Sequence, residues 1–239
     1  MHIANSHISQ VRLLYCRLLS PTNANYLTFF FLCITAIGLP LSAFLMSTGT
    51  VGLAATWLLS CDWNYKMQNL KQNKIVLPIA AIIIIHLLWL INTTNFGYAL
   101  HDINKKMPLL VIPLAVGSTR LSQKQINAVL QCFVSATFIC SMVSLAVYMG
   151  WYTPHKPINN IRDISLFISH IRLGLMSTMS AYIVLHTIIA KWQQLSLATK
   201  LAMLCLSAWL VEFTVLMQTI TSWVAFATAA ATLALAYSS

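Results

Sequence analysis

The chain has 239 residues, of which 59% are hydrophobic and 8% are charged, and its formal net charge at pH 7 is +10. Soluble domains contain about 45–50% apolar and about 25% charged residues, so this composition excludes a soluble globular domain and a disordered chain. The long apolar stretches also exclude an outer-membrane barrel, whose strands alternate apolar and polar residues. We therefore predict an all-α fold, a polytopic transmembrane helical bundle.

The prediction divides the chain into a mixed, polar segment at residues 1–25 and a transmembrane helical domain at residues 26–239. The apolar stretch from Tyr26 to Ser60 is too long for one span, so we place a turn at Ser47-Thr48-Gly49. Pro40 is expected to kink the helix before that turn. About eight apolar segments result, at residues 26–45, 49–62, 75–92, 107–117, 127–150, 164–190, 200–217 and 219–237. Segment 107–117 contains two prolines and is short enough to be broken or re-entrant.

The distribution of basic residues predicts a cytoplasmic N-terminus, because lysine and arginine accumulate in cytoplasmic loops. With that orientation the cytoplasmic basic residues are Arg12, Arg17, Lys66, Lys71, Lys74, Arg120, Lys124, Lys191 and Lys200. The external ones are Lys105, Lys106, Lys156 and Arg162. The same bias explains the net positive charge without a nucleic-acid partner, and we expect membrane lipids to surround the helices.

No metal or cofactor site is predicted. None of the six cysteines forms a C-x-x-C pair, and most lie in apolar stretches, where cysteine behaves as a small hydrophobic residue. Histidine, cysteine and carboxylate side chains do not cluster at metal-ligand spacings, and no phosphate-binding loop or nucleophile elbow is present. His86 and His186 are interpreted as packing residues.

Arg172 and Glu212 are the two strongly ionic side chains that lie well inside predicted segments. At 1.5 Å of rise per residue, Arg172 is expected about 12 Å and Glu212 about 9 Å below the outer face. Intramembrane charges usually pair or face a polar cavity. We therefore expect either a structural ion pair or an outward-opening cavity in which Arg172 meets an anionic ligand.

Other polar residues of segment 164–190 are candidates for the lining of such a cavity. Ser165, Ser169, Arg172 and Ser180 share one stripe at helical spacing, which would line a cavity or a helix contact. His170 lies on a different face, and a packing role and a catalytic role are equally compatible with it. The cavity-lining prediction therefore comprises His170, Glu212 and Ser169.

Two predicted external loops carry basic residues beside aromatic ones. The loop at residues 151–163 contains Trp151 and Arg162, and the loop before segment 107–117 contains Lys105 and Lys106. The first loop suits either a lipid-linked phosphate or a sugar, or it is an ordinary solvated loop with an aromatic anchor at the membrane surface. In the second loop, two lysines are unusual on the side of the membrane that is normally poor in positive charge.

Four stretches, in order, resemble the first two-thirds of the O-antigen ligase and polymerase family in the form found in Bacteroides-like bacteria. They read IGLPLSAFL, INKKMPLLVIPLAV, NIRDISLFISHIRLGL and LMQTITSWVAFA, and the third is the most specific. The resemblance covers residues from about 26 to the end. It implies a multi-pass protein of the bacterial inner membrane that transfers a glycan without a metal at the periplasmic face.

In that family the glycan leaves undecaprenyl pyrophosphate and joins lipid A-core in a ligase, or a growing glycan in a polymerase. The resemblance gives the phosphate-binding role to Arg172, with Arg162, Lys105 and Lys106 as weaker candidates. Fixed positive charge would offset the negative charge that grows on the pyrophosphate as the glycosidic bond breaks. The resemblance identifies no catalytic base in this sequence.

Two departures from the family pattern lead us to expect a chain that is inactive alone. Ile220 stands where relatives have an arginine, and the family's large periplasmic loop and last segments do not occur in this sequence. The alternative hypothesis is that the protein is a small membrane transporter or transporter subunit. In that case Arg172 and Glu212 would line a solute path.

Overall fold

The computed structural model describes residues 21–60, 63–73, 76–89, 93, 96–152 and 160–238, and every regular element within these ranges is helical. The N-terminal segment up to residue 20 lies outside the described residues. The α-helices are α2 (Pro21–Leu41), α3 (Ala43–Leu59), α4 (Trp63–Gln72), α5 (Val76–Trp89), α6 (Phe96–Ser118), α7 (Gln123–Tyr148), α8 (His170–Ala190), α9 (Leu197–Leu216) and α10 (Ile220–Ser238). A short 3₁₀ helix, η2 (Ile161–Ile164), precedes α8.

Four of the described helices are long and apolar enough to cross a membrane. They are Asn23–Leu41, Gln123–Tyr148, His170–Ala190 and Leu197–Leu216. A fifth candidate is the pair Ala43–Leu59 and Trp63–Gln72, which is bent by 116° at its break. Helix α5 has only 14 residues, and α6 carries Asp102, Lys105 and Lys106 in its first half. The all-helical fold is confirmed, whereas the number of eight membrane segments stays a prediction.

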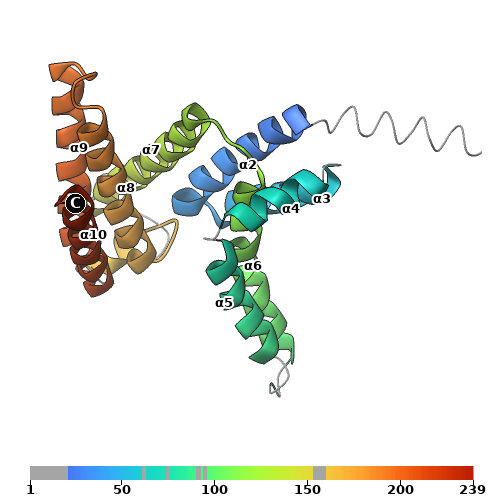
Figure 1. The fold of residues 1–239 in the computed structure, drawn as a ribbon. Helices are drawn as coiled ribbons and strands as arrows, with labels where there is room; N and C mark the ends of the chain where they lie inside the picture. Colours follow the sequence, from blue (N-terminus) through green and yellow to red (C-terminus); the bar gives the residue numbers. More distant parts are fainter. Residues whose placement is uncertain are drawn as a thin grey trace, which may run out of the picture. The chain divides into compact units, whose positions relative to one another are not determined.

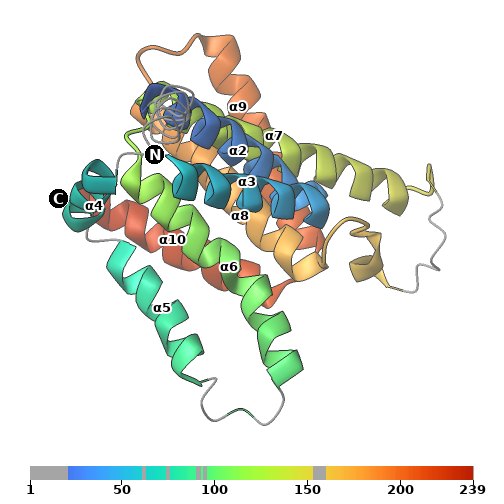
Figure 2. The same ribbon diagram turned by 90° about the vertical axis from the view of Figure 1, so that its right-hand side faces the viewer.

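The helices divide into two compact units, 1–35 with 47–126, and 36–46 with 127–239. In the first unit α5 and α6 lie side by side (Figures 1 and 2). In the second unit α8 packs closely on α9 and also on α10 (Figure 1).

The break between the first two apolar helices lies at Ser42, so the turn predicted at residues 47–49 is wrong. Pro40 is the penultimate residue of α2, where its missing N–H weakens the helix, and α3 begins at Ala43. Gly49 and Thr50 are buried inside α3. A Cβ atom built on Gly49 would lie 2.3 Å from Thr35 Oγ1 and 2.8 Å from the Thr35 backbone nitrogen. Gly49 therefore allows a close helix contact and does not form a turn.

Helix α6 begins eleven residues before the predicted segment 107–117 and includes both of its prolines. The polar stretch in front of that segment continues the helix because Tyr98, Asp102 and Lys106 recur at intervals of four and share one face. The remaining predicted segments differ from α5, α7, α9 and α10 by a few residues at each end, as expected for helix boundaries.

A cluster around a buried lysine joins α3, α4 and α6 in the first unit. Lys66 of α4 is 6% exposed, and its Nζ donates hydrogen bonds to the carbonyl oxygens of Trp57 and, at 3.0 Å, Ser60. The same ammonium lies 5.2 Å from the Trp57 ring centroid and 4.8 Å from that of Trp63. Asn69 Nδ2 and Trp57 Nε1 each donate to Ser118, at 3.0 Å. We call Trp57, Trp63, Lys66, Asn69 and Ser118 the Lys66 cluster.

The core of the second unit is apolar and contains contributions from α7, η2, α8 and α9. Its buried members are Cys140, Val147, Ile164, Leu173, Phe213 and Met217. Trp209 Nε1 donates to Ser141 Oγ at 2.9 Å, and Tyr182 Oη donates to the Phe226 carbonyl oxygen at 2.6 Å. These bonds satisfy the polar ends of two large aromatic side chains and so fix the helices that carry them.

The cytoplasmic location of the N-terminus stays a prediction, and it has a direct test. Reporter fusions after Lys71 and after Asn159, which lies outside the described residues, are expected to report cytoplasm and periplasm respectively. Opposite signals at both positions would reverse the orientation of every segment.

Candidate functional site

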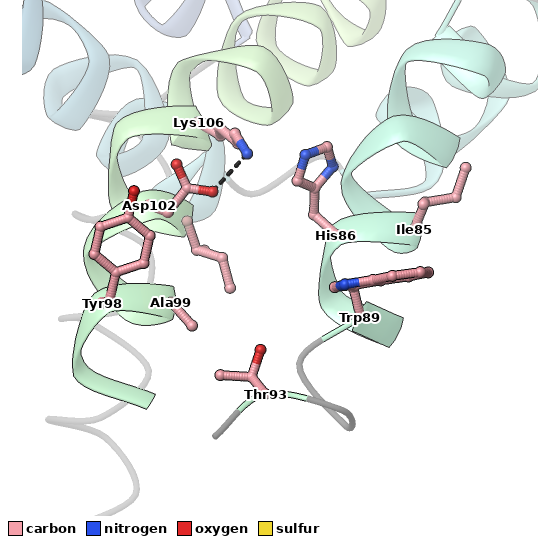
Figure 3. A pocket seen from close by; sticks show the side chains of 9 residues that line it. Ile85, His86, Trp89, Thr93, Tyr98, Ala99, Asp102 and Lys106 are labelled. Atoms are coloured by element: carbon pink, nitrogen blue, oxygen red, sulfur yellow. Dashed lines mark hydrogen bonds and ion pairs between the residues drawn. The ribbon is translucent and has the colours of Figure 1, made fainter. Parts of the chain in front are cut away.

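A cleft of about 370 Å³ lies between α5 and α6 in the first unit (Figure 3). This volume is within the range of about 300–1,000 Å³ that is usual for small-molecule sites. The cleft combines aromatic, aliphatic and ionic side chains. Its lining residues are Ile85, His86, Trp89, Thr93, Tyr98, Ala99, Asp102, Ile103 and Lys106. We call it the α5–α6 cleft.

Helical spacing places the polar side chains of both helices on the walls of the cleft. His86 and Trp89 are three residues apart on α5, and Tyr98, Asp102 and Lys106 follow one another at intervals of four on α6. Figure 3 shows His86 projecting from α5 toward the helix that carries Asp102 and Lys106.

An ion pair lies on the α6 wall, where Lys106 Nζ is 2.5 Å from Asp102 Oδ2. The two side chains are 34% and 42% exposed, so water screens the pair and its contribution to stability is below about 1 kcal/mol. Its main effect is therefore local: it holds a carboxylate acceptor and an ammonium donor next to each other with no net charge.

His86 presents a defined hydrogen-bonding atom to the cleft. Its Nδ1 lies 2.7 Å from the carbonyl oxygen of Ile82, and because a carbonyl oxygen only accepts, Nδ1 is the donor. In the neutral imidazole the other ring nitrogen, Nε2, is then an acceptor. The two walls together offer an imidazole acceptor, a carboxylate acceptor and an ammonium donor.

Two aromatic residues extend the cleft outward. Trp89 is 72% and Tyr98 is 73% exposed, although both line the cleft. Exposed aromatic rings beside hydrogen-bonding groups suit a ligand with both apolar faces and hydroxyl groups.

No group of three or more histidine, cysteine or acidic residues suited to a metal ion occurs among the described residues. The α5–α6 cleft contributes only His86 and Asp102 of these types.

The structure places Arg172 at the beginning of a helix. Helix α8 begins at His170 and not at Ile164, so Arg172 is its third residue, about 3 Å along the axis. The helical rise from Ile164 on which the predicted depth of about 12 Å depends is therefore not present, and the depth itself stays a prediction. Ser169 is the N-cap residue, and its side chain makes no capping hydrogen bond. Because Ser165 and Ser169 precede the helix, the predicted stripe through Arg172 and Ser180 does not exist.

The predicted ion pair between Arg172 and Glu212 is absent. Both side chains are exposed, and the one ion pair found among the described residues joins Lys106 and Asp102. Glu212 lies in α9, four residues before its last residue, Leu216. A cavity shared by Arg172 and Glu212 stays a prediction.

The other predicted phosphate-binding residues lie in separate elements. Arg162 is exposed in η2, whose first turn is held by a reciprocal cap between Asn160 and Asp163. Lys105 belongs to α6, and its side chain lies outside the described atoms. Lys106 is the one predicted site residue that lines the α5–α6 cleft.

Sequence reasoning missed most of the α5–α6 cleft. His86 was interpreted as a packing residue, yet it lines the cleft with Trp89, Tyr98 and Asp102. The interval of four that relates Tyr98, Asp102 and Lys106 is the signal that would have identified one wall. The opposite wall has no comparable signal because His86 is a single strongly polar residue in an otherwise apolar helix without periodicity.

Searches of protein-family models, curated proteins and solved structures find no match to this chain.

Proposed function

We propose that this chain is a multi-pass protein of the bacterial inner membrane that belongs to the O-antigen ligase and polymerase type. In this proposal it binds a glycan linked to undecaprenyl pyrophosphate at the periplasmic face. The glycan is transferred to lipid A-core, or to a growing glycan if the protein is a polymerase. The observation that carries the proposal is the α5–α6 cleft, with its aromatic rim and its paired hydrogen-bonding groups.

The cleft supports the proposal through both its chemistry and its position in the sequence. Asp102 and His86 Nε2 are acceptors for sugar hydroxyl groups, and Lys106 is a donor. The stretch INKKMPLLVIPLAV, which carries part of the family resemblance, begins at Ile103 and includes Lys106, and both residues line the cleft. The loop beside it is predicted to be external.

The pyrophosphate has a different set of proposed contacts. Because Asp102 neutralises Lys106, the cleft suits the sugar better than the phosphate groups. The resemblance implies the phosphate role for Arg162 and Arg172, which are both exposed in the second unit, and that role is proposed for the second unit by itself. Arginine suits this role because its planar guanidinium donates two parallel hydrogen bonds to phosphate oxygens.

Trp89→Ala is expected to weaken binding of a lipid-linked glycan about tenfold, which corresponds to about 1.4 kcal/mol. The loss follows from removing an exposed aromatic wall of the cleft without disturbing the buried core. The measurement is titration of purified protein in detergent with undecaprenyl-pyrophosphate-linked oligosaccharide. Trp223→Ala on α10 is the matched control, since Trp223 is 46% exposed and does not line the cleft. Equal affinities for the wild type and Trp89→Ala would contradict the glycan-binding role.

The reaction class has its own test. Incubation of the protein with labelled lipid-linked glycan and lipid A-core separates the alternatives: a chain that is inactive alone, as expected, binds the glycan without moving label, whereas label on lipid A-core would identify an active ligase. Label on a second lipid-linked glycan would identify a polymerase. Movement of an unmodified solute across a proteoliposome membrane, with no transfer of label, would contradict the proposal and favour a transporter.

A further inference from the structure

A second hollow lies between α7, α8 and α9 in the second unit, and it shares no lining residue with the α5–α6 cleft. Its volume is about 240 Å³. We call it the α7–α9 groove. It includes none of the residues used in the proposed glycan site, so it requires a separate explanation.

The groove is amphipathic along the helix axes. Val134, Val184 and Leu206 line its inner part, and Val134 and Val184 are 7% and 4% exposed. Gln131 and Lys191 line the end that coincides with the beginning of α7 and the end of α8. An apolar interior with a polar, cationic end matches the division of a phospholipid into acyl chain and headgroup.

The charge at this end is positive and is not neutralised within the groove. Lys191 is the C-cap residue of α8, and no acidic residue lines the groove. Lys191 takes no part in the one ion pair found in the described part of the chain. A second cation lies at the same α8–α9 corner, where Lys200 Nζ is 4.3 Å from the ring centroid of Trp192. Both features favour a ligand with a negative headgroup.

The position of the lysines fits the surface of a membrane. Tryptophan and lysine are enriched where helices leave the hydrocarbon region, and Trp192 and Lys191 directly follow α8, a candidate membrane span. Each lysine near an anionic membrane surface contributes about 1 kcal/mol of attraction. By the charge bias of the sequence, this end of the helices is cytoplasmic.

We propose that the α7–α9 groove binds one anionic phospholipid, with an acyl chain along Val134, Val184 and Leu206 and the phosphate at Lys191. The site is distinct from the lipid-linked glycan site in location and in chemistry. It gives this membrane protein a preference for anionic lipids such as phosphatidylglycerol over zwitterionic phosphatidylcholine.

The test measures phosphatidylglycerol retained by purified protein after exchange from mixed micelles that contain equal parts phosphatidylglycerol and phosphatidylcholine. Lys191→Gln is expected to lower retention about fivefold, because the phosphate loses its cation. Lys191→Arg is expected to retain the lipid, since the charge is kept. Ser135→Trp is also expected to lower retention, because Ser135 lines the groove and a large ring would fill it. Lys71→Gln, on the exposed face of α4, is the control and is expected to have no effect.

Three outcomes would overturn the proposal. Wild-type retention in Lys191→Gln would exclude the phosphate contact. Wild-type retention in Ser135→Trp would show that the lipid binds surface charge and leaves the groove empty. Displacement of the phospholipid by equal concentrations of glycerol phosphate would show a phosphate site with no contribution from the acyl chain. Thermal unfolding of each variant checks that the fold is intact.

Discussion

Replacing Lys66 by methionine is expected to lower the free energy of unfolding by about 3 kcal/mol. Methionine keeps most of the apolar stem of lysine and removes its charge and its donors. The carbonyl oxygens of Trp57 and Ser60, at the end of α3, then lose the ammonium that satisfies them. A buried acceptor left without a partner costs about 1–3 kcal/mol.

Two further interactions disappear in the same variant. The ammonium lies over the rings of Trp57 and Trp63, and a desolvated cation–π contact contributes up to about 2 kcal/mol. It also lies at the C-terminal end of α3, where the helix dipole favours a positive charge by about 0.3–1 kcal/mol. These contributions overlap because one ammonium makes all of them, so their sum exceeds the expected loss.

Thermal unfolding of the detergent-solubilised protein, followed by circular dichroism, measures this effect. A loss of about 3 kcal/mol corresponds to a fall in Tm of about 6–12 °C for a chain of this size. Lys71→Met is the matched control because Lys71 is exposed on the same helix, and its Tm should stay near that of the wild type. Equal Tm values for the two variants would show that the Lys66 cluster does not stabilise the first unit.

Replacing Gly49 by alanine is expected to lower the free energy of unfolding by about 2–3 kcal/mol. Alanine is normally the better helix former by about 1 kcal/mol, so a loss would come from the tertiary contact. The added Cβ would lie 2.8 Å from the Thr35 backbone nitrogen and 3.0 Å from the Thr35 Cα atom. Backbone atoms cannot rotate away, so α2 and α3 must separate, and overpacking of this kind costs about 1–3 kcal/mol or more.

Gly52 provides the comparison for this prediction, because it lies three residues further along the same helix. A Cβ on Gly52 meets only atoms of the Phe31 ring, the nearest at 2.2 Å, and a side chain can adjust where a backbone cannot. Gly52→Ala is therefore expected to cost about 1 kcal/mol, clearly less than Gly49→Ala. Chemical denaturation of both variants checks the order, and a larger loss for Gly52→Ala would contradict the close contact between Gly49 and Thr35.

The helical class of this protein could be predicted from its sequence alone. Long apolar stretches with few charges leave backbone groups that only a helix can satisfy within a membrane. Residues 127–150 and 200–217 were predicted as helices, and α7 and α9 match them to within four residues at each end. Neither stretch contains a proline, so the local pattern and the tertiary structure agree.

Element boundaries beside polar residues were decided by the tertiary structure. Ser47, Thr48 and Gly49 have the composition of a turn, yet they continue α3 because Gly49 packs against Thr35. Conversely, residues 164–169 are predicted to be helical. In the structure they are instead the last residue of a 3₁₀ helix and an irregular segment before α8. This second difference moves Arg172 from the predicted interior of a span to the beginning of a helix.

The environment of individual charges was also decided by the tertiary structure. The sequence marks Lys66 as one of several cytoplasmic lysines, and only the fold encloses its ammonium between two tryptophan rings and two carbonyl oxygens. Lys106 is a predicted phosphate-binding residue because of its place in a basic external loop. The cleft that it lines exists only because His86 and Trp89 of another helix form the opposite wall. Composition and periodicity determine which segments are helical. The partners of each side chain depend on which helices pack together, and that information lies in contacts between residues far apart in the chain.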